Sequence, residues 1–119
     1  MHTASFPVAP FGRRLGTRME GEQARRQLES CLASVPEDGQ VQIELEGLEV
    51  LSTSFADELI GKTLQQLVDG DWGDRSLVLI SPSIDLTDGL DAKLAQRQLA
   101  MICLTHERWR LIGAYTEPM

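Results

Sequence analysis

Three consecutive hydroxyl residues, Ser52, Thr53 and Ser54, are the residues best placed for chemistry, and the acids Asp57 and Glu58 follow closely. A hydroxyl just before a helix caps it by accepting a hydrogen bond from an amide of the first turn. The same place suits phosphorylation, because the free amides and the helix dipole favour an added anion. The residue types leave both roles open: plain capping, or Thr53 and Ser54 as candidate phosphoacceptors.

The adjacent acids Asp57 and Glu58 have two interpretations. Successive side chains on a helix point about 100° apart, so this pair does not flank one substrate bond as the carboxylates of glycosidases do. In the first turn of a helix, their negative charge offsets the positive end of the dipole. On an exposed helix face, the same acids, together with Lys62, would contact a protein partner.

Candidates for catalysis and metal binding are sparse. His2 lies near the N-terminus and His106 in a predicted turn, so neither is placed beside a nucleophile as Ser-His-Asp or Cys-His chemistry requires. The two histidines also lack zinc-ligand spacing, and Cys31 and Cys103 sit among apolar residues like small buried hydrophobes. With no glycine-rich phosphate loop either, we expect no catalytic activity, no metal and no cofactor.

The charge of the chain is unevenly distributed. A net charge of −7 argues against sequence-independent nucleic-acid binding, which depends on neutralising phosphates. Arg13, Arg14 and Arg18 nevertheless precede the first acid, Glu20. These arginines are either a solvated basic lead-in, a docking patch for an acidic partner, or the counter-charge of an anion-binding site.

The composition indicates one folded domain. The chain has 119 residues, of which 42% are hydrophobic and 24% charged. No apolar run approaches the roughly 20 residues that span a bilayer, and the first ten residues lack the pattern of a secretory signal. We therefore expect a cytoplasmic location without membrane contact.

Periodicity predicts an α/β fold with a mixed sheet of about four to five strands and three helices. A capping box at Thr17 and Glu20 marks the start of the first helix. Residues 1–16 form an N-terminal segment with an edge strand, and residues 17–119 form the domain. The predicted strands are 5–8, 41–45, 77–80, 99–104 and 109–115, and the predicted helices are 18–34, 55–67 and 86–94.

The C-terminal part allows two folds. Residues 99–115 either continue the third helix or form a hairpin, and we favour the hairpin because Trp109, Leu111, Ile112 and Tyr115 are strand-forming residues. Gly89 is expected to weaken the third helix by about 1 kcal/mol relative to alanine.

The string from Leu51 to Glu58, with Gly21 and the upstream Thr17-Arg18, resembles the STAS-like family of unknown function. Its core is Ser-x-Ser-Phe-Ala-Asp-Glu, and the resemblance covers about residues 12–115. This family is related in fold to the STAS-domain antagonists of anti-sigma factors. The resemblance implies a regulatory domain whose partner is a protein, with a histidine-kinase-like ATPase as the candidate.

Two positions depart from the antagonists' pattern. Ser52 stands in the place of their aspartate and Phe55 in the place of their glycine, while Thr53 occupies the place of the phosphorylated hydroxyl. Phe55 is expected either to pack inward at the start of the helix or to serve as an exposed contact for a partner.

Together these features predict a non-catalytic, regulatory protein-binding module. Its docking surface would comprise Ser52, Thr53, Ser54, Asp57, Glu58 and Lys62. The alternative is a small-ligand or nucleotide-binding domain, in which the same helix N-terminus binds an anion with help from Arg13, Arg14 or Arg18.

Overall fold

A five-stranded mixed sheet is the centre of the part of the chain described by the structure, a computed structural model covering residues 2–106 and 108–114. β1 (Thr3–Pro7), β3 (Gln40–Glu44), β5 (Ser76–Ile80) and β6 (Ala100–Thr105) are parallel. β7 (Arg108–Gly113) pairs antiparallel with β6. The order β1-β3-β5-β6-β7 leaves β1 and β7 at the edges.

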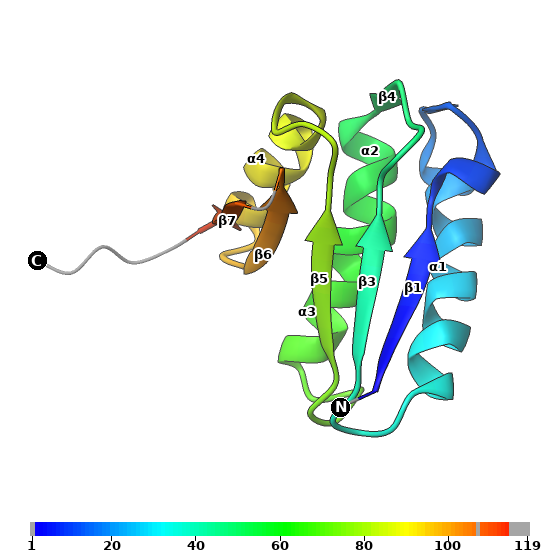
Figure 1. Cartoon of the computed structure of the whole chain (residues 1–119), viewed down its shortest axis with the longest axis vertical. Helices are drawn as coiled ribbons and strands as arrows, with labels where there is room; N and C mark the ends of the chain where they lie inside the picture. The colour runs from blue at the N-terminus through cyan, green and yellow to red at the C-terminus, as the bar shows by residue number, and fades with distance from the viewer. Residues whose placement is uncertain (1, 107, 115–119) are drawn as a thin grey trace, which may run out of the picture.

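The helices of the described residues cover one face of this sheet (Figure 1). α1 (Arg18–Ser34) begins with the predicted capping box, since Thr17 and Glu20 bond reciprocally. α2 (Thr53–Ala56), a π-helical turn (Asp57–Gly61) and α3 (Lys62–Val68) form one continuous helix. This helix contacts α1 on one side and α4 (Asp88–Gln96) on the other, so it is the middle helix of the layer.

The core lies between the helices and the inward-facing residues of the strands. Alternate positions of β3 are buried, as the sequence pattern predicts for a strand with one covered face, whereas Leu77, Val78 and Leu79 of β5 are all buried. Each large side chain that is fully buried contributes about 1.5–3 kcal/mol. The buried residues include Phe6, Val41, Ile43, Leu77 and Leu79 from the strands and Leu28, Leu32, Phe55, Leu59, Ile60 and Leu94 from the helices.

Most predicted elements are present, with three helices, counting the continuous one as a single helix, and five strands in the main sheet of the described chain. The predicted hairpin is confirmed, although Tyr115 lies outside the described residues. The sequence did not predict a short parallel pair between β2 (Arg14–Leu15) and β4 (Val50–Leu51). These two-residue strands are too short to produce an alternating pattern.

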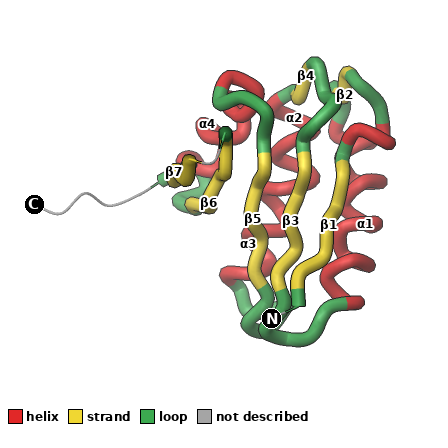
Figure 2. Tube along the Cα trace, in the orientation of Figure 1, coloured by secondary structure: helices red, strands yellow, loops and turns green. Residues whose placement is uncertain are grey.

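The connections that follow β1, β3 and β5 gather at the carboxyl edge of the parallel strands (Figure 2). They carry β2, β4 and the segment 81–87, and they lead into α1, α2 and α4. In open α/β sheets this edge is where ligands commonly bind. No helix in the described part of the chain has the length and apolar character needed to cross a membrane.

Candidate functional site

The hydroxyl run lies at this carboxyl edge, where β4 leads directly into α2. Ser52 is the N-cap: its Oγ accepts a hydrogen bond of 3.1 Å from the amide of Phe55. Thr53 is exposed and Ser54 half-buried, and no described residue forms a hydrogen bond with either hydroxyl. Capping therefore belongs to Ser52, while Thr53 is an exposed residue whose hydroxyl caps no described amide.

The side chain of Thr53 also fixes how closely α4 approaches. A Cβ at Gly89 would collide with the Thr53 Oγ1 and lie 3.3 Å from the Thr53 Cα. Gly89 therefore allows the two helices to pack closely, although a glycine lowers the helix propensity of α4. The Thr53 hydroxyl therefore lies at a close contact between two helices, although the residue as a whole is exposed.

A groove of about 390 Å³ runs beside the hydroxyl run. Val50 and Leu51 in its wall directly precede Ser52, and Val50 is 37% exposed. The full lining is Leu48, Glu49, Val50, Leu51, Pro82, Ser83, Asp85 and Leu86. The carboxyl edge thus combines an exposed threonine with a shallow groove that is partly apolar.

Phe55, Asp57 and Glu58 are buried. Phe55 is 0% exposed, so its predicted inward packing is confirmed. The expectation that the acids lie on an exposed helix face is wrong, because Asp57 is 3% and Glu58 5% exposed. The reason is the position of their helix: α1 and α4 cover both of its flanks. Lys62 remains partly exposed.

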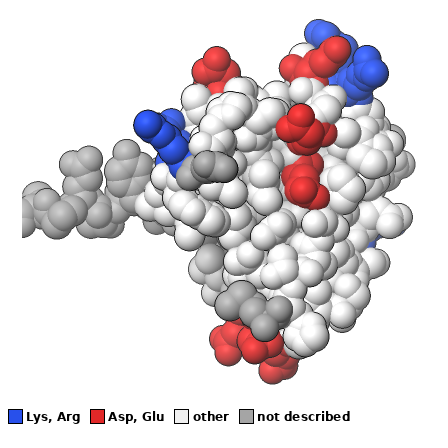
Figure 3. Space-filling view, in the orientation of Figure 1, with Lys and Arg blue, Asp and Glu red and all other residues white. Residues whose placement is uncertain are grey.

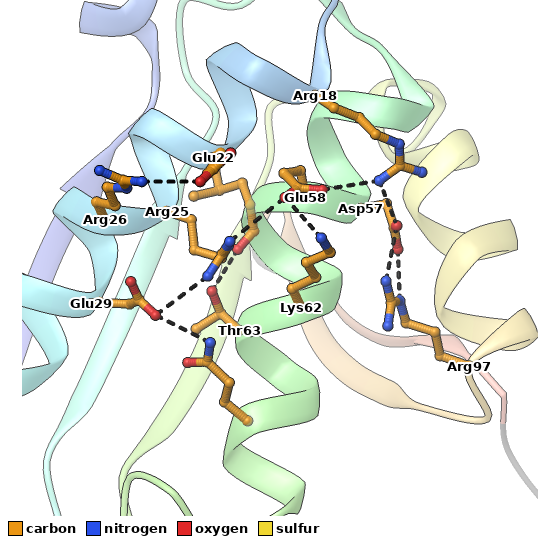
Figure 4. A network of polar contacts seen from close by, with 12 residues as sticks. Arg18, Glu22, Arg25, Arg26, Glu29, Asp57, Glu58, Lys62, Thr63 and Arg97 are labelled. Atoms are coloured by element: carbon orange, nitrogen blue, oxygen red, sulfur yellow. Dashed lines mark hydrogen bonds and ion pairs between the residues drawn. The ribbon is translucent and has the colours of Figure 1, made fainter.

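Asp57 forms the more tightly bound half of a buried ion-pair cluster (Figure 4). Its Oδ1 accepts from Arg97 Nε at 2.7 Å and its Oδ2 from Arg97 Nη2 at 3.0 Å. Arg18 Nη1 donates to the same Oδ2 at 3.1 Å. Because Arg97 ends α4 and Arg18 begins α1, this one carboxylate links three helices.

Glu58 binds cations on the opposite flank (Figure 4). It accepts from Arg18 Nη1 at 3.0 Å and from Lys62 Nζ at 2.9 Å, and Arg25 Nη2 lies 3.6 Å from its Oε1. Arg18 therefore bridges the two carboxylates. The Arg25 Nε is buried without a hydrogen-bond partner among the described residues.

Glycines make room for this cluster. A Cβ at Gly21 would lie 2.7 Å from the Glu58 Cβ, and one at Gly61 would lie 2.6 Å from the Asp57 Oδ1. The π-helical turn is also here, since the Lys62 amide donates to the Asp57 carbonyl. Turns of this kind occur frequently at functional sites. Glycines inside helical patterns were the sequence signal for this close packing, whereas nothing in the sequence marked Arg25 and Arg97.

The cluster lowers the pKa of both carboxyls. Hydrogen bonds from Arg97 lower the pKa of Asp57 most strongly; burial opposes this effect and Arg18 adds to it. For Glu58 burial raises the pKa, but hydrogen bonds from Lys62 and Arg18 outweigh it, so the net pKa is lowered. Both groups are therefore held as carboxylates, which suits structural ion pairs better than acid–base catalysis.

The lowered pKa values predict a stability that falls in acid. A carboxyl whose pKa is lower in the folded state than in the unfolded state stabilises the fold above its unfolded pKa, here 4.5 for Glu58 and 3.8 for Asp57. We expect urea unfolding to give a free energy that decreases as the pH falls below these values. In an Asp57→Asn/Glu58→Gln variant this decrease should be clearly shallower. An unchanged slope would contradict the assignment.

The three N-terminal arginines do not form one site. Arg18 is bound to Asp57 and Glu58, and Arg14 lies 3.6 Å from Glu49 with both side chains largely exposed. Arg13 is exposed and forms no ion pair with a described carboxylate. The strongest candidate for binding an anion therefore already neutralises two acids.

The remaining candidates are dispersed. His2 and His106 are both exposed, the first beside β1 and the second in the β6–β7 turn. Cys103 is buried as predicted, Cys31 is only half-buried, and burial raises the pKa of both thiols. Across residues 2–106 and 108–114, no three side chains of His, Cys, Asp or Glu come together in a way that could hold a metal ion.

Comparisons of the chain with protein-family models, with curated proteins and with solved structures gave no match. A functional proposal therefore depends on the geometry of the site and on the resemblance of Leu51–Glu58 given above.

Proposed function

We propose that this chain is a non-catalytic, regulatory protein-binding module of the STAS-like type that acts in the cytoplasm. It docks a protein partner through the carboxyl edge around Ser52, Thr53 and Ser54. A histidine-kinase-like ATPase is the partner class that the similarity of Leu51–Glu58 to STAS-like domains favours.

Thr53, an exposed residue whose hydroxyl bonds to no described residue, carries this proposal. It begins a helix whose cap is already supplied by Ser52, so capping does not require it. Val50 and Leu51, which precede Ser52, line the neighbouring groove. A partner that filled this groove and extended over the start of α2 would contact Thr53, so a modification of Thr53 would control docking.

Because Thr53 Oγ1 lies close to Gly89, a phosphate on it would require the side chain to turn away from α4, and it would change docking. It adds about −1.5 to −2 charges at neutral pH, and the helix N-terminus accommodates negative charge. Glu49 and Asp85 already line the groove, so the added charge makes this edge strongly acidic. Such a change weakens contact with an apolar or acidic surface.

The ion-pair cluster supports the docking edge from beneath. Asp57 and Glu58 join α1, the middle helix and α4 one turn below the hydroxyls. These acids orient the site without touching the partner. For the alternative of a small-ligand or nucleotide site, Arg18 is committed to two carboxylates, which leaves Arg13 and Arg14 to supply the counter-charge.

Affinity purification from the native cell tests the proposal, with Thr53→Glu as the variant. We expect the variant to recover about ten-fold less of the partner than the wild-type protein does. This corresponds to the loss of one interface contact worth about 1.4 kcal/mol. Ser30→Glu is the matched control, because it adds the same charge at an exposed position of α1.

Mass spectrometry of the peptide containing Ser52–Ser54 completes the test by showing whether Thr53 carries phosphate in the cell. Equal recovery of every protein by the wild type and Thr53→Glu, with unchanged melting temperatures, would rule out docking at this edge.

A further inference from the structure

The edge strand β7 has two chemically different faces. Its sequence alternates Arg108, Trp109, Arg110 and Leu111. Arg110 pairs in register with the buried Cys103, so the arginines lie on the side of the sheet covered by the helices. Trp109 and Leu111 therefore lie on the uncovered side.

The uncovered side of β5, β6 and β7 is apolar. The register aligns Ile80, Leu104 and Trp109 in one row across the three strands, and Leu111 pairs with Ile102 in the next. Trp109 is 62%, Leu111 49% and Ile102 45% exposed. Viewed from this side, the molecular surface is mostly uncharged (Figure 3).

A groove extends this surface between β5 and β6. The two strands pair at Leu79–Cys103 and Ile80–Leu104, and β6 then splays away from β5 toward the other end (Figure 1). The resulting hollow has a volume of about 330 Å³, and its lining includes Leu67, Val68, Arg75, Ile102 and Leu111. Apolar surface around β7 is thus continuous with a recess into the layer beneath.

Arg75, Arg108 and Arg110 lie around this edge of a protein whose net charge is −7, with Asp88 and Asp91 of α4 beside Arg110. Arg75, Arg108 and Arg110 form no ion pair with a carboxylate of the described residues, in contrast to Arg14, Arg18, Arg25, Arg26, Lys62 and Arg97. In Figure 3, one of the basic groups lies where Figure 1 places β6 and β7. The edge therefore favours an acidic partner.

The same alternation argues against a second copy of this chain as the occupant. If two β7 strands paired antiparallel about a two-fold axis, Arg108 and Arg110 of both copies would share one face. Four guanidinium groups would then gather across the new strand pair, and like charges across a strand pair are destabilising. Charged side chains on an edge strand are a common means of preventing self-association.

We propose that β7 binds an extended segment of a protein partner in which acidic residues alternate with apolar residues. The segment adds a strand to the sheet through the outward backbone groups of Trp109 and Leu111, since the Gly113 amide already donates to Asp91 Oδ1. Its acids face Arg108 and Arg110, and its apolar side chains face Trp109 and Leu111 on the uncovered side. This surface is separate from the hydroxyls at the carboxyl edge, so the proposal does not depend on the docking site proposed there.

A peptide titration monitored by nuclear magnetic resonance tests this inference. The probes are a short capped peptide that alternates glutamate with valine and a matched peptide with lysine in place of glutamate. We expect the amide chemical shifts of Arg108–Gly113 to change on binding. The glutamate peptide should bind about ten-fold more tightly than the lysine peptide, because it places opposite rather than like charges across from two arginines.

An Arg108→Glu/Arg110→Glu variant should reverse this preference, whereas Arg13→Glu should leave it unchanged. Both arginines are exposed, so an unchanged melting temperature will show that the variant is folded. Trp109→Ser should weaken both peptides. The inference is overturned by equal binding of the two peptides, by no binding at millimolar concentration, by shifts confined to another surface, or by sedimentation showing a dimer joined through β7.

Discussion

Replacing Asp57 by alanine should lower the free energy of unfolding by about 3 kcal/mol, the low end of the range for breaking a buried ion pair. The carboxylate is 3% exposed and accepts two hydrogen bonds from Arg97 and one from Arg18. Its loss leaves the Arg97 guanidinium in a partly buried site without its carboxylate. The expected cost is at the low end because both arginines keep some access to water.

A double-mutant cycle with Arg97→Ala isolates the pair. Urea unfolding of Asp57→Ala, Arg97→Ala and the double variant should show that the double change costs clearly less than the sum of the single changes. Asp69→Ala is the matched control, because Asp69 is exposed and accepts only from Gln65 among the described residues. Additive costs within about 0.5 kcal/mol would mean that Asp57 and Arg97 are not coupled.

Local patterns predicted the elements of this fold well. The capping box at Thr17 set the start of α1, and alternation set β3, because both signals depend on residues close in the chain. The strand-forming residues after Arg108 correctly favoured a hairpin over a longer helix. The edge strand is also present, although it covers Thr3–Pro7 and begins earlier than predicted.

The environment of Asp57 could not be predicted in this way. Its partners Arg18 and Arg97 lie 39 and 40 residues away, so no local pattern connects them. Adjacent acids near a helix start are most often exposed, and that expectation failed because the helix lies between two others. Tertiary packing buries Asp57 and Glu58, so residues that were predicted to contact a partner instead connect the helices inside the protein.

This reassignment separates the site into two layers with different chemistry. Thr53 and the neighbouring groove are exposed and can meet a partner, whereas Asp57 and Glu58 hold the helices that carry them. Substitutions in the two layers should therefore differ in kind. Changes at Thr53 should alter binding first, and changes at Asp57 should alter stability first.

Replacing Gly21 by alanine should destabilise the protein by about 2 kcal/mol, a typical cost of overpacking. In an unobstructed helix interior the same change would stabilise by about 1 kcal/mol, so the predicted effect has the opposite sign. The new Cβ would lie 2.7 Å from the Glu58 Cβ and 2.9 Å from the Phe55 carbonyl oxygen. Neither atom is the end of a flexible side chain, so α1 itself must move.

Movement of α1 would also disturb the ion pairs, because Arg18 and Arg25 flank Gly21 on the same helix and both contact Glu58. Thermal and urea unfolding of Gly21→Ala measure the cost, with Gln23→Ala at an exposed α1 position as the control that reports helix propensity alone. A Gly21→Ala protein more stable than the wild type would show that α1 and the middle helix are not in close contact. A less stable one with a weaker dependence on acid pH would show that the glycine holds the helices close enough for the cluster to form.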